Sequence, residues 1–233
     1  MKKPTISFFC PAYRDEENLP ILIPHVMRVL KKHTSAFNIL IVVDGDLVTK
    51  IVADSLARQY SKYITIVYHN QNQGYGAALK SGFRNAKKHE YVFYTDGDCQ
   101  YDVAEISRLL DVREGADGVI GYRTKRVMSF PRQVQTVVYN VLIQLLFGLH
   151  VRDVNCSMKL VRRDVLDTIQ LTSNSAFIDA ELLILLQEAK RTIREVEVTH
   201  YPRHAGKAGG GSLKVVSQTV ADMFRMKFQH KKI

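Results

Sequence analysis

Short apolar runs alternate with segments of helical periodicity in the first half of the chain. The runs, rich in Val, Ile, Phe and Tyr, predict buried strands at Thr5–Cys10, Ile39–Val43, Thr65–Tyr68, Tyr91–Thr95 and Gly118–Tyr122. Between them, apolar residues recur at helical spacing around residues 21–30, 78–86 and 103–110. Strands that alternate with helices predict an α/β fold, with a mostly parallel sheet flanked by helices on both faces.

The rhythm changes after residue 122. The second half predicts, in order, a basic loop at Thr124–Arg132, an apolar helix at 134–149, a strand near Met158–Val161, a helix near Asp179–Lys190, a strand at Arg194–Val198, a flexible loop at Ala205–Ser212 and a helix at 213–229. We expect one domain over residues 1–233, divided into 1–122, 123–212 and an amphipathic basic tail at 213–233.

Basic residues outnumber acidic ones, 33 Lys and Arg against 23 Asp and Glu, for a formal charge of +10. The excess lies in residues 121–166 and 188–233, whereas residues 1–120 are almost neutral. Such a balance suits an anionic partner, whether nucleic acid, nucleotide, phospholipid surface or phosphorylated substrate.

The spacing of the cysteines and the lengths of the apolar stretches indicate in which cellular compartment we expect the protein. Cys10, Cys99 and Cys156 are widely spaced, which is typical of a reducing, cytoplasmic environment. The N-terminal apolar run is too short for a signal peptide. Polar residues interrupt 134–149, so we expect no transmembrane helix there.

Acidic residues follow three of the predicted strands. Asp15 follows the first strand, Asp44 ends the second, and Asp96-Gly97-Asp98 follows the fourth. In an open parallel sheet, ligands bind outside the carboxyl ends of the strands. Two carboxylates separated by one glycine can face a single Mg²⁺ or Mn²⁺, with Gln100 as a third oxygen ligand. The alternative is an ordinary polar turn.

Taken together, these motifs resemble glycosyltransferase family 2, particularly its polyprenyl- (dolichyl-) phosphate sugar synthase branch. The matching residues, in chain order, are Pro11, Tyr13, Asn18 and Leu19; Val43 and Asp44; Asn72, Gly74, Gly76 and Ala78; Asp96, Asp98 and Gln100; Gly121 and Arg123; the segment from Asp153 to Arg163; and Pro202, Arg203, Gly206 and Lys207. Two departures are Arg14-Asp15, where the family usually has Asn-Glu, and Asp44-Gly45-Asp46, which lacks the usual paired aspartates.

The resemblance implies a GT-A-type nucleotide-sugar-binding fold and a metal-dependent, inverting transfer of a hexose from a GDP- or UDP-sugar. Residues 1–122 would form the donor half and residues 123–212 the acceptor half. Asp96, Asp98 and Gln100 would hold Mg²⁺ or Mn²⁺. Donor-binding residues implied by the resemblance are Pro11, Tyr13, Asp15, Asp44, Gly76, Lys80, Asp96 and Gly97.

The acceptor decides whether the reaction needs a base. A polyprenyl phosphate is already ionised near neutral pH and needs cationic positioning, for which Arg123, Arg132, Arg203 and Lys207 are candidates. A glycan hydroxyl needs a carboxylate base, and the resemblance offers Asp179 for that role. The alternative is that Asp179 is a helix N-cap, and Asp153 the structural partner of an arginine.

Two further alternatives stay open. The helices at 134–149 and 213–229 suit either contact with a membrane surface, at its cytoplasmic face, or packing in a core or homo-oligomer interface. A nucleic-acid-binding α/β module would also use the positive charge, but no basic stripe with interleaved aromatic residues supports it.

Overall fold

The computed structural model describes residues 2–124, 130–206 and 213–230, and only the backbone of residues 130–132, 213–214 and 229–230. Its helices and strands follow one another as β1 (Thr5–Ala12), α1 (Leu19–His33), β2 (Ala36–Asp44), α2 (Leu47–Gln59), β3 (Ile64–His69), α3 (Tyr75–Asn85), β4 (Tyr91–Tyr94), the 3₁₀ turn η1 (Val103–Glu105), α4 (Ile106–Asp111), β5 (Gly118–Arg123), α5 (Phe130–Phe147), β6 (Lys159–Arg162), α6 (Arg163–Leu166), α7 (Ile178–Glu188), β7 (Ile193–Val198) and α8 (Leu213–His230).

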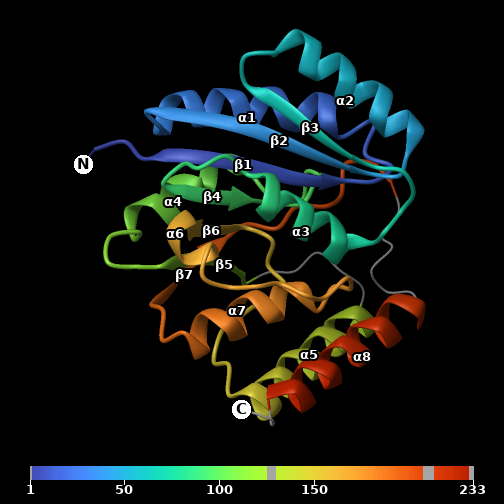
Figure 1. Cartoon of the computed structure of the whole chain (residues 1–233), viewed down its shortest axis with the longest axis vertical. Coiled ribbons are helices and arrows are strands. Elements are labelled where there is room, and N and C mark those ends of the chain that lie inside the picture. The colour runs from blue at the N-terminus through green and yellow to red at the C-terminus, as the bar shows by residue number, and fades with distance from the viewer. Residues whose placement is uncertain (1, 125–129, 207–212, 231–233) are drawn as a thin grey trace.

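The strands form one sheet in the order β3-β2-β1-β4-β6-β5-β7 (Figure 1). Among the strands of the described residues, only β6 runs antiparallel to its neighbours, β4 and β5. The α/β fold with a mostly parallel sheet is therefore confirmed. Because β6 reverses direction between β4 and β5, the carboxyl end of β5 lies at the same edge of the sheet as the carboxyl ends of β1, β2 and β4.

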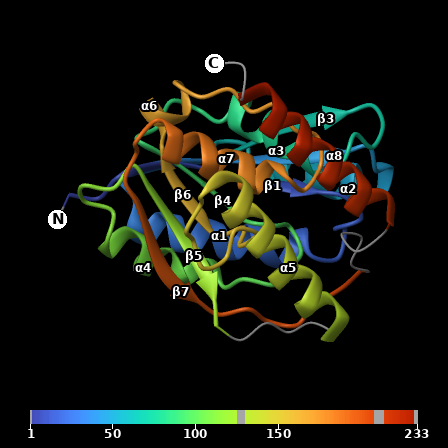
Figure 2. The ribbon, with the colours of Figure 1, turned by 90° about the horizontal axis from the view of Figure 1, so that it is seen from below.

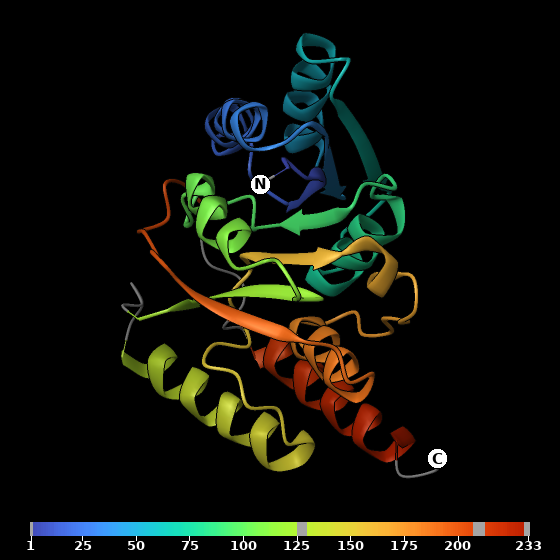
Figure 3. The same cartoon turned by 90° about the vertical axis from the view of Figure 1, so that its left-hand side faces the viewer.

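Buried side chains fill both faces of the sheet. On β1, Phe8 packs into the cluster under α1, α2 and α4, whereas Phe9 packs into the cluster under α3 and α7. This alternation follows from the two-residue period of a strand. On the second face, α5 and α8 lie side by side beyond α7 (Figures 1 and 3). Lys227 of α8 ties them together by donating to the carbonyl oxygen of Leu146.

The structure differs from the elements predicted from the sequence in three places. Helix α2 has no counterpart among the predicted helices, because Leu47, Val48 and Ile51 are exposed and obscure its periodicity. Its start is set by Asp46, whose carboxylate caps the helix by accepting from the Thr49 amide at 2.8 Å. The predicted basic loop ends early, since α5 already begins at Phe130. The short helix α6 was also unforeseen.

Candidate functional site

Polar segments follow β1, β2, β4 and β5 at the shared edge of the sheet. The segment Asp96-Gly97-Asp98 lies directly against the segment after β1. A Cβ atom on Gly97 would lie 2.7 Å from the Pro11 carbonyl oxygen and 3.2 Å from Asp15 Oδ2. Because the backbone carbonyl cannot give way cheaply, glycine is required here for two acidic segments to meet.

Burial and mutual repulsion dominate the electrostatics of these carboxylates. Burial, and then the charges of Asp98 and Asp179, raise the pKa of Asp96 to about 7. Burial also raises the pKa of Asp98, although the nearby Arg203 guanidinium opposes that shift. Arg203 Nη2 lies 2.6 Å from Asp98 Oδ2. The site thus concentrates negative charge that a cation would neutralise.

The donor set fits a hard divalent cation. Asp96 Oδ1 is buried and has no hydrogen-bond partner among the described residues, so an oxygen ligand is available beside Asp98. Across the part of the chain that the structure describes, no three His, Cys, Asp or Glu side chains gather in a way that could hold a metal. A cation here would therefore depend on two carboxylates together with oxygens from a bound ligand, as Mg²⁺ commonly does.

Gln100, the third residue expected to bind the metal, already forms hydrogen bonds within the protein. Its side-chain amide nitrogen donates to the Tyr201 carbonyl at 3.1 Å, and its backbone amide donates to Asp98 Oδ1 at 3.1 Å. These bonds hold the segment around Tyr201, and with it Arg203, beside the acidic pair. A role of Gln100 as a metal ligand stays a prediction.

Asp15 organises the segment after β1. Its carboxylate accepts from the Tyr13 amide at 3.0 Å and from Asn18 Nδ2 at 2.8 Å. Tyr13 is 41% exposed at the edge of the sheet, and the Arg14 guanidinium lies 5.2 Å from its ring centre. The positive φ of Arg14, 59°, is part of this tight turn.

Asp44 lies at the same edge, and its carboxylate accepts hydrogen bonds from within the protein. It accepts from His69 Nδ1 at 2.7 Å and from the amides of Gln73 and Gly74 at 2.8 and 2.9 Å. Its carboxylate therefore fixes the start of α3. A contact of Asp44 with a nucleoside stays a prediction.

Gly76 and Lys80 of α3 contact the chain segment before α7. A Cβ on Gly76 would lie 2.5 Å from the backbone of Asn174, whose carbonyl accepts from the Gly76 amide at 3.1 Å. Lys80 Nζ donates to the Thr172 carbonyl at 2.9 Å. Both residues thus have structural contacts, and their donor-binding roles are untested.

Arg123, at the end of β5, forms a bidentate ion pair. Its Nε and Nη2 donate to the two Asp153 oxygens at 2.6 and 2.9 Å, and Asp153 is fully buried. Asp153 is thus the structural partner of an arginine. The side chain of Arg132, and Lys207 as a whole, lie outside the described residues.

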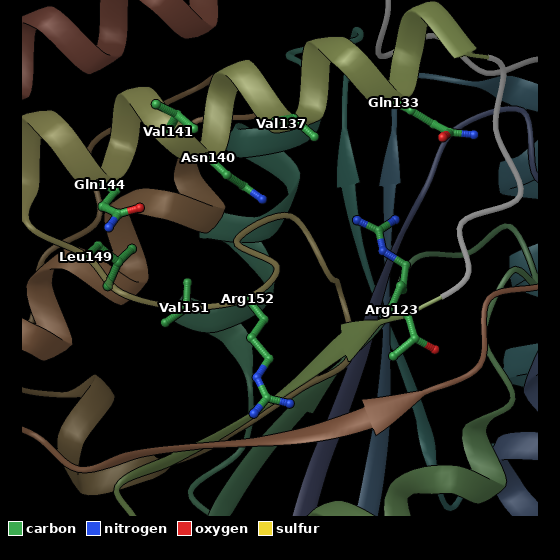
Figure 4. A pocket seen from close by; sticks show the side chains of 10 residues that line it. Arg123, Gln133, Val137, Asn140, Val141, Gln144, Leu149, Val151 and Arg152 are labelled. Carbon is green, nitrogen blue, oxygen red and sulfur yellow. The ribbon is translucent and has the colours of Figure 1, made fainter.

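An open pocket of about 410 Å³ adjoins Arg123 between β5 and α5 (Figure 4). Val137, Val141 and Leu149 supply apolar surface, and Arg152 supplies a guanidinium that lies 4.4 Å from the Tyr122 ring centre. The pocket therefore offers both apolar and cationic surface beside the acidic edge.

Asp179 lies in the first turn of α7, whose N-cap is Phe177, so the N-cap interpretation is wrong. Asp179 is 3% exposed, and its Oδ1 accepts from the Tyr94 hydroxyl and from Lys159 Nζ, both at 2.5 Å. The sequence reasoning missed Lys159. The available signal was a lysine that stands between Met158 and Leu160 in a predicted buried strand.

The arrangement of strands and helices is shared with solved glycosyltransferase structures of the GT-A fold. Glucosyl-3-phosphoglycerate synthase from Mycobacterium tuberculosis, crystallised with Mn²⁺, UDP and glucosyl-3-phosphoglycerate, superposes with a TM-score of 0.73 at 17% identity, over 96% of this chain and 80% of that one. Mannosyl-3-phosphoglycerate synthase from Rubrobacter xylanophilus gives a TM-score of 0.71 at 15% identity, over 98% and 75% of the two chains.

Sequence comparison defines the family. The model of glycosyl transferase family 2 matches residues 7–170, and the chain belongs to that family. Undecaprenyl-phosphate 4-deoxy-4-formamido-L-arabinose transferase of Aeromonas hydrophila subsp. hydrophila is 29% identical over 216 residues, and its Serratia proteamaculans counterpart is 29% identical over 217. Each alignment spans 91% of this chain but 64% of the relative's length. Along the part of the chain that the structure describes, every helix is too short or too polar to cross a membrane.

Proposed function

We propose that this protein is a metal-dependent, inverting glycosyltransferase that moves a sugar from a nucleotide diphosphate sugar to a polyprenyl phosphate. The observation that carries the proposal is the buried Asp96 oxygen beside Asp98 at the carboxyl edge of the sheet, which has no hydrogen-bond partner in the part of the chain that the structure describes. Membership of glycosyl transferase family 2 and the undecaprenyl phosphate named in two relatives support it. The two relatives are named as transferases of a modified arabinose, so the transfer of a hexose by this chain stays a prediction.

On the donor side, Asp96 and Asp98 would hold Mg²⁺ or Mn²⁺, which neutralises charge on the departing diphosphate when it is bound. Asp15 orders the turn that carries Tyr13, and the exposed Tyr13 ring is the surface on which a nucleoside base would stack. Arg203 supplies a cation at the same edge, where the diphosphate and the acceptor phosphate would meet.

On the acceptor side, positive charge and apolar surface lie together. The pocket beside Arg123 and Arg152 offers both. Helix α5 exposes Val138 and Leu145, the last 76% exposed, and α8, which lies near α5 (Figure 2), exposes Phe224 and Phe228. We propose that this surface contacts a membrane at its cytoplasmic face. The three cysteines, all unpaired, agree with a reducing compartment.

The alternative acceptor, a glycan hydroxyl with Asp179 as base, has weaker support. Asp179 Oδ1 already accepts two hydrogen bonds, one of them from an ammonium group.

A thermal-shift panel of UDP-, GDP- and CDP-sugars, each with and without Mn²⁺, tests the donor site. We expect one nucleotide to raise Tm in the presence of Mn²⁺, and the metal-dependent part to vanish in Asp98→Asn. Asp111→Asn, an exposed aspartate at the end of α4, is the matched control and should behave as wild type. If no nucleotide sugar stabilises the wild-type protein, the donor assignment is wrong.

A further inference from the structure

Lys159 is a fully buried lysine to which the proposed reaction gives no role. It lies in β6, the reversed strand between β4 and β5, and its side chain is 0% exposed. Its Nζ donates to the Cys156 carbonyl at 2.6 Å and to Asp179 Oδ1 at 2.5 Å. A buried ammonium is tolerated only when it is paired and hydrogen-bonded, so Lys159 and Asp179 depend on each other.

This ion pair lies directly behind the acidic edge of the donor site. Tyr94, which donates to Asp179, is the last residue of β4, and Asp96 follows two residues later. The charge of Asp179 is among the causes that raise the pKa of Asp96. Asp179 is therefore a carboxylate close to the donor site that could act as a base if it were free to take up a proton.

Lys159 prevents that use. A carboxylate base must take up a proton, but protonated Asp179 would leave the Lys159 charge buried and uncompensated, which is strongly unfavourable. The Tyr94 hydroxyl also donates a hydrogen bond to Asp179 Oδ1. We propose that Lys159 determines acceptor specificity: by holding Asp179 in an ion pair, it withdraws the base from the site and restricts transfer to acceptors that are already anionic. The inference rests on the proposed glycosyltransferase function and names the residue that sets its acceptor class.

The two possible transfers differ in their proton balance. With a phosphate acceptor, a phosphate oxygen bonds to the anomeric carbon, the bond from that carbon to the diphosphate oxygen breaks, and no proton moves. With water or another hydroxyl, the oxygen forms the same bond, the same diphosphate leaves, and the hydroxyl proton must pass to a base. Hydrolysis of the nucleotide sugar therefore reports whether Asp179 is available as a base.

The test compares wild type with Lys159→Gln and with the double variant Lys159→Gln/Asp179→Asn. Gln keeps a donor toward the Cys156 carbonyl but removes the charge, and the double variant restores a neutral pair of similar size. Lys50→Gln/Asp54→Asn, an exposed Lys–Asp pair on α2, is the matched control. Each protein is assayed with Mn²⁺ and the nucleotide sugar that stabilises it, with undecaprenyl phosphate in detergent or with water alone as acceptor.

We expect the double variant to keep lipid transfer at saturating Mn²⁺ within about threefold of wild type. Lys159→Gln should raise the ratio of hydrolysis to lipid transfer by about tenfold or more, and Asp179→Asn should cancel that rise. The control pair should change neither quantity.

Two results would overturn the inference. Lipid transfer that falls by about 10²-fold or more in the folded double variant would make Asp179 the working base. An unchanged ratio in folded Lys159→Gln would reduce Lys159 to a structural residue. If Lys159→Gln does not fold, the double variant still decides between the two roles of Asp179. Wild-type protein that makes no lipid product would refute the proposed acceptor instead, and the rate of nucleotide-sugar hydrolysis by Lys159→Gln relative to wild type would still test the ion pair.

Discussion

The buried ion pair of Arg123 and Asp153 allows a quantitative prediction of stability. Asp153→Asn keeps the shape of the side chain and removes its charge, which leaves a guanidinium only 8% exposed without its counter-ion. Burial alone would lower the pKa of Arg123, but the hydrogen bonds and charge of Asp153 raise it above its ordinary value. Breaking such a pair from one side costs about 3–5 kcal/mol. For a chain of this size, that corresponds to a fall in Tm of roughly 6–20 °C.

Thermal unfolding followed by circular dichroism measures the effect. Asp164→Asn is the control, because Asp164 pairs with Arg162 at the surface, where the two side chains are 64% and 43% exposed. An exposed pair contributes about 1 kcal/mol or less, so Tm should fall by about 4 °C at most. Adding Arg123→Gln to Asp153→Asn should recover part of the loss. Equal Tm values for Asp153→Asn and Asp164→Asn would refute the assignment of a buried, mutually dependent pair.

Three further predictions concern the edge of the sheet and the outer helices. Gly97→Ala places a Cβ 2.7 Å from a carbonyl oxygen of β1, so titration calorimetry should show nucleotide affinity reduced by about tenfold or more; wild-type affinity would mean that this close approach is dispensable. Arg203→Gln removes the cation paired with Asp98, so binding of Mn²⁺ alone should tighten while binding of nucleoside diphosphate with Mn²⁺ weakens; two unchanged constants would contradict a phosphate-facing role. Leu145→Asp should reduce co-sedimentation with anionic vesicles, whereas Val48→Asp on α2 should not, and equal binding of both variants would exclude α5 from the membrane contact.

The fold was largely predictable because its strands are short and strongly apolar. Residues of β1 and β2 are buried on both faces, which gives near-continuous apolar runs that periodicity detects. Helix α2 could not be found in the same way, since its apolar residues Leu47, Val48 and Ile51 point outward. The reversal of β6 was equally hidden, because the apolar pattern of a buried strand is the same in either direction.

The acidic edge was predictable for a topological reason. Parallel strands bring their carboxyl ends together, so Asp15 and the Asp96–Asp98 segment had to meet. The ion pairs were not predictable in detail, because they join residues far apart in sequence. Asp179 and Lys159 are 20 residues apart on a helix and a reversed strand, and nothing local indicates their contact. A sequence pattern therefore suggested Asp179 as a base, whereas the structure shows that Lys159 forms an ion pair with it.

The decisive experiment is the transfer of radiolabelled sugar to undecaprenyl phosphate in detergent, with Mn²⁺ and the nucleotide sugar selected by the thermal-shift panel. We expect a labelled lipid product from wild type and from Asp111→Asn, and its loss in Asp98→Asn. No lipid product from wild type with any nucleotide sugar, or undiminished product from Asp98→Asn, would contradict it.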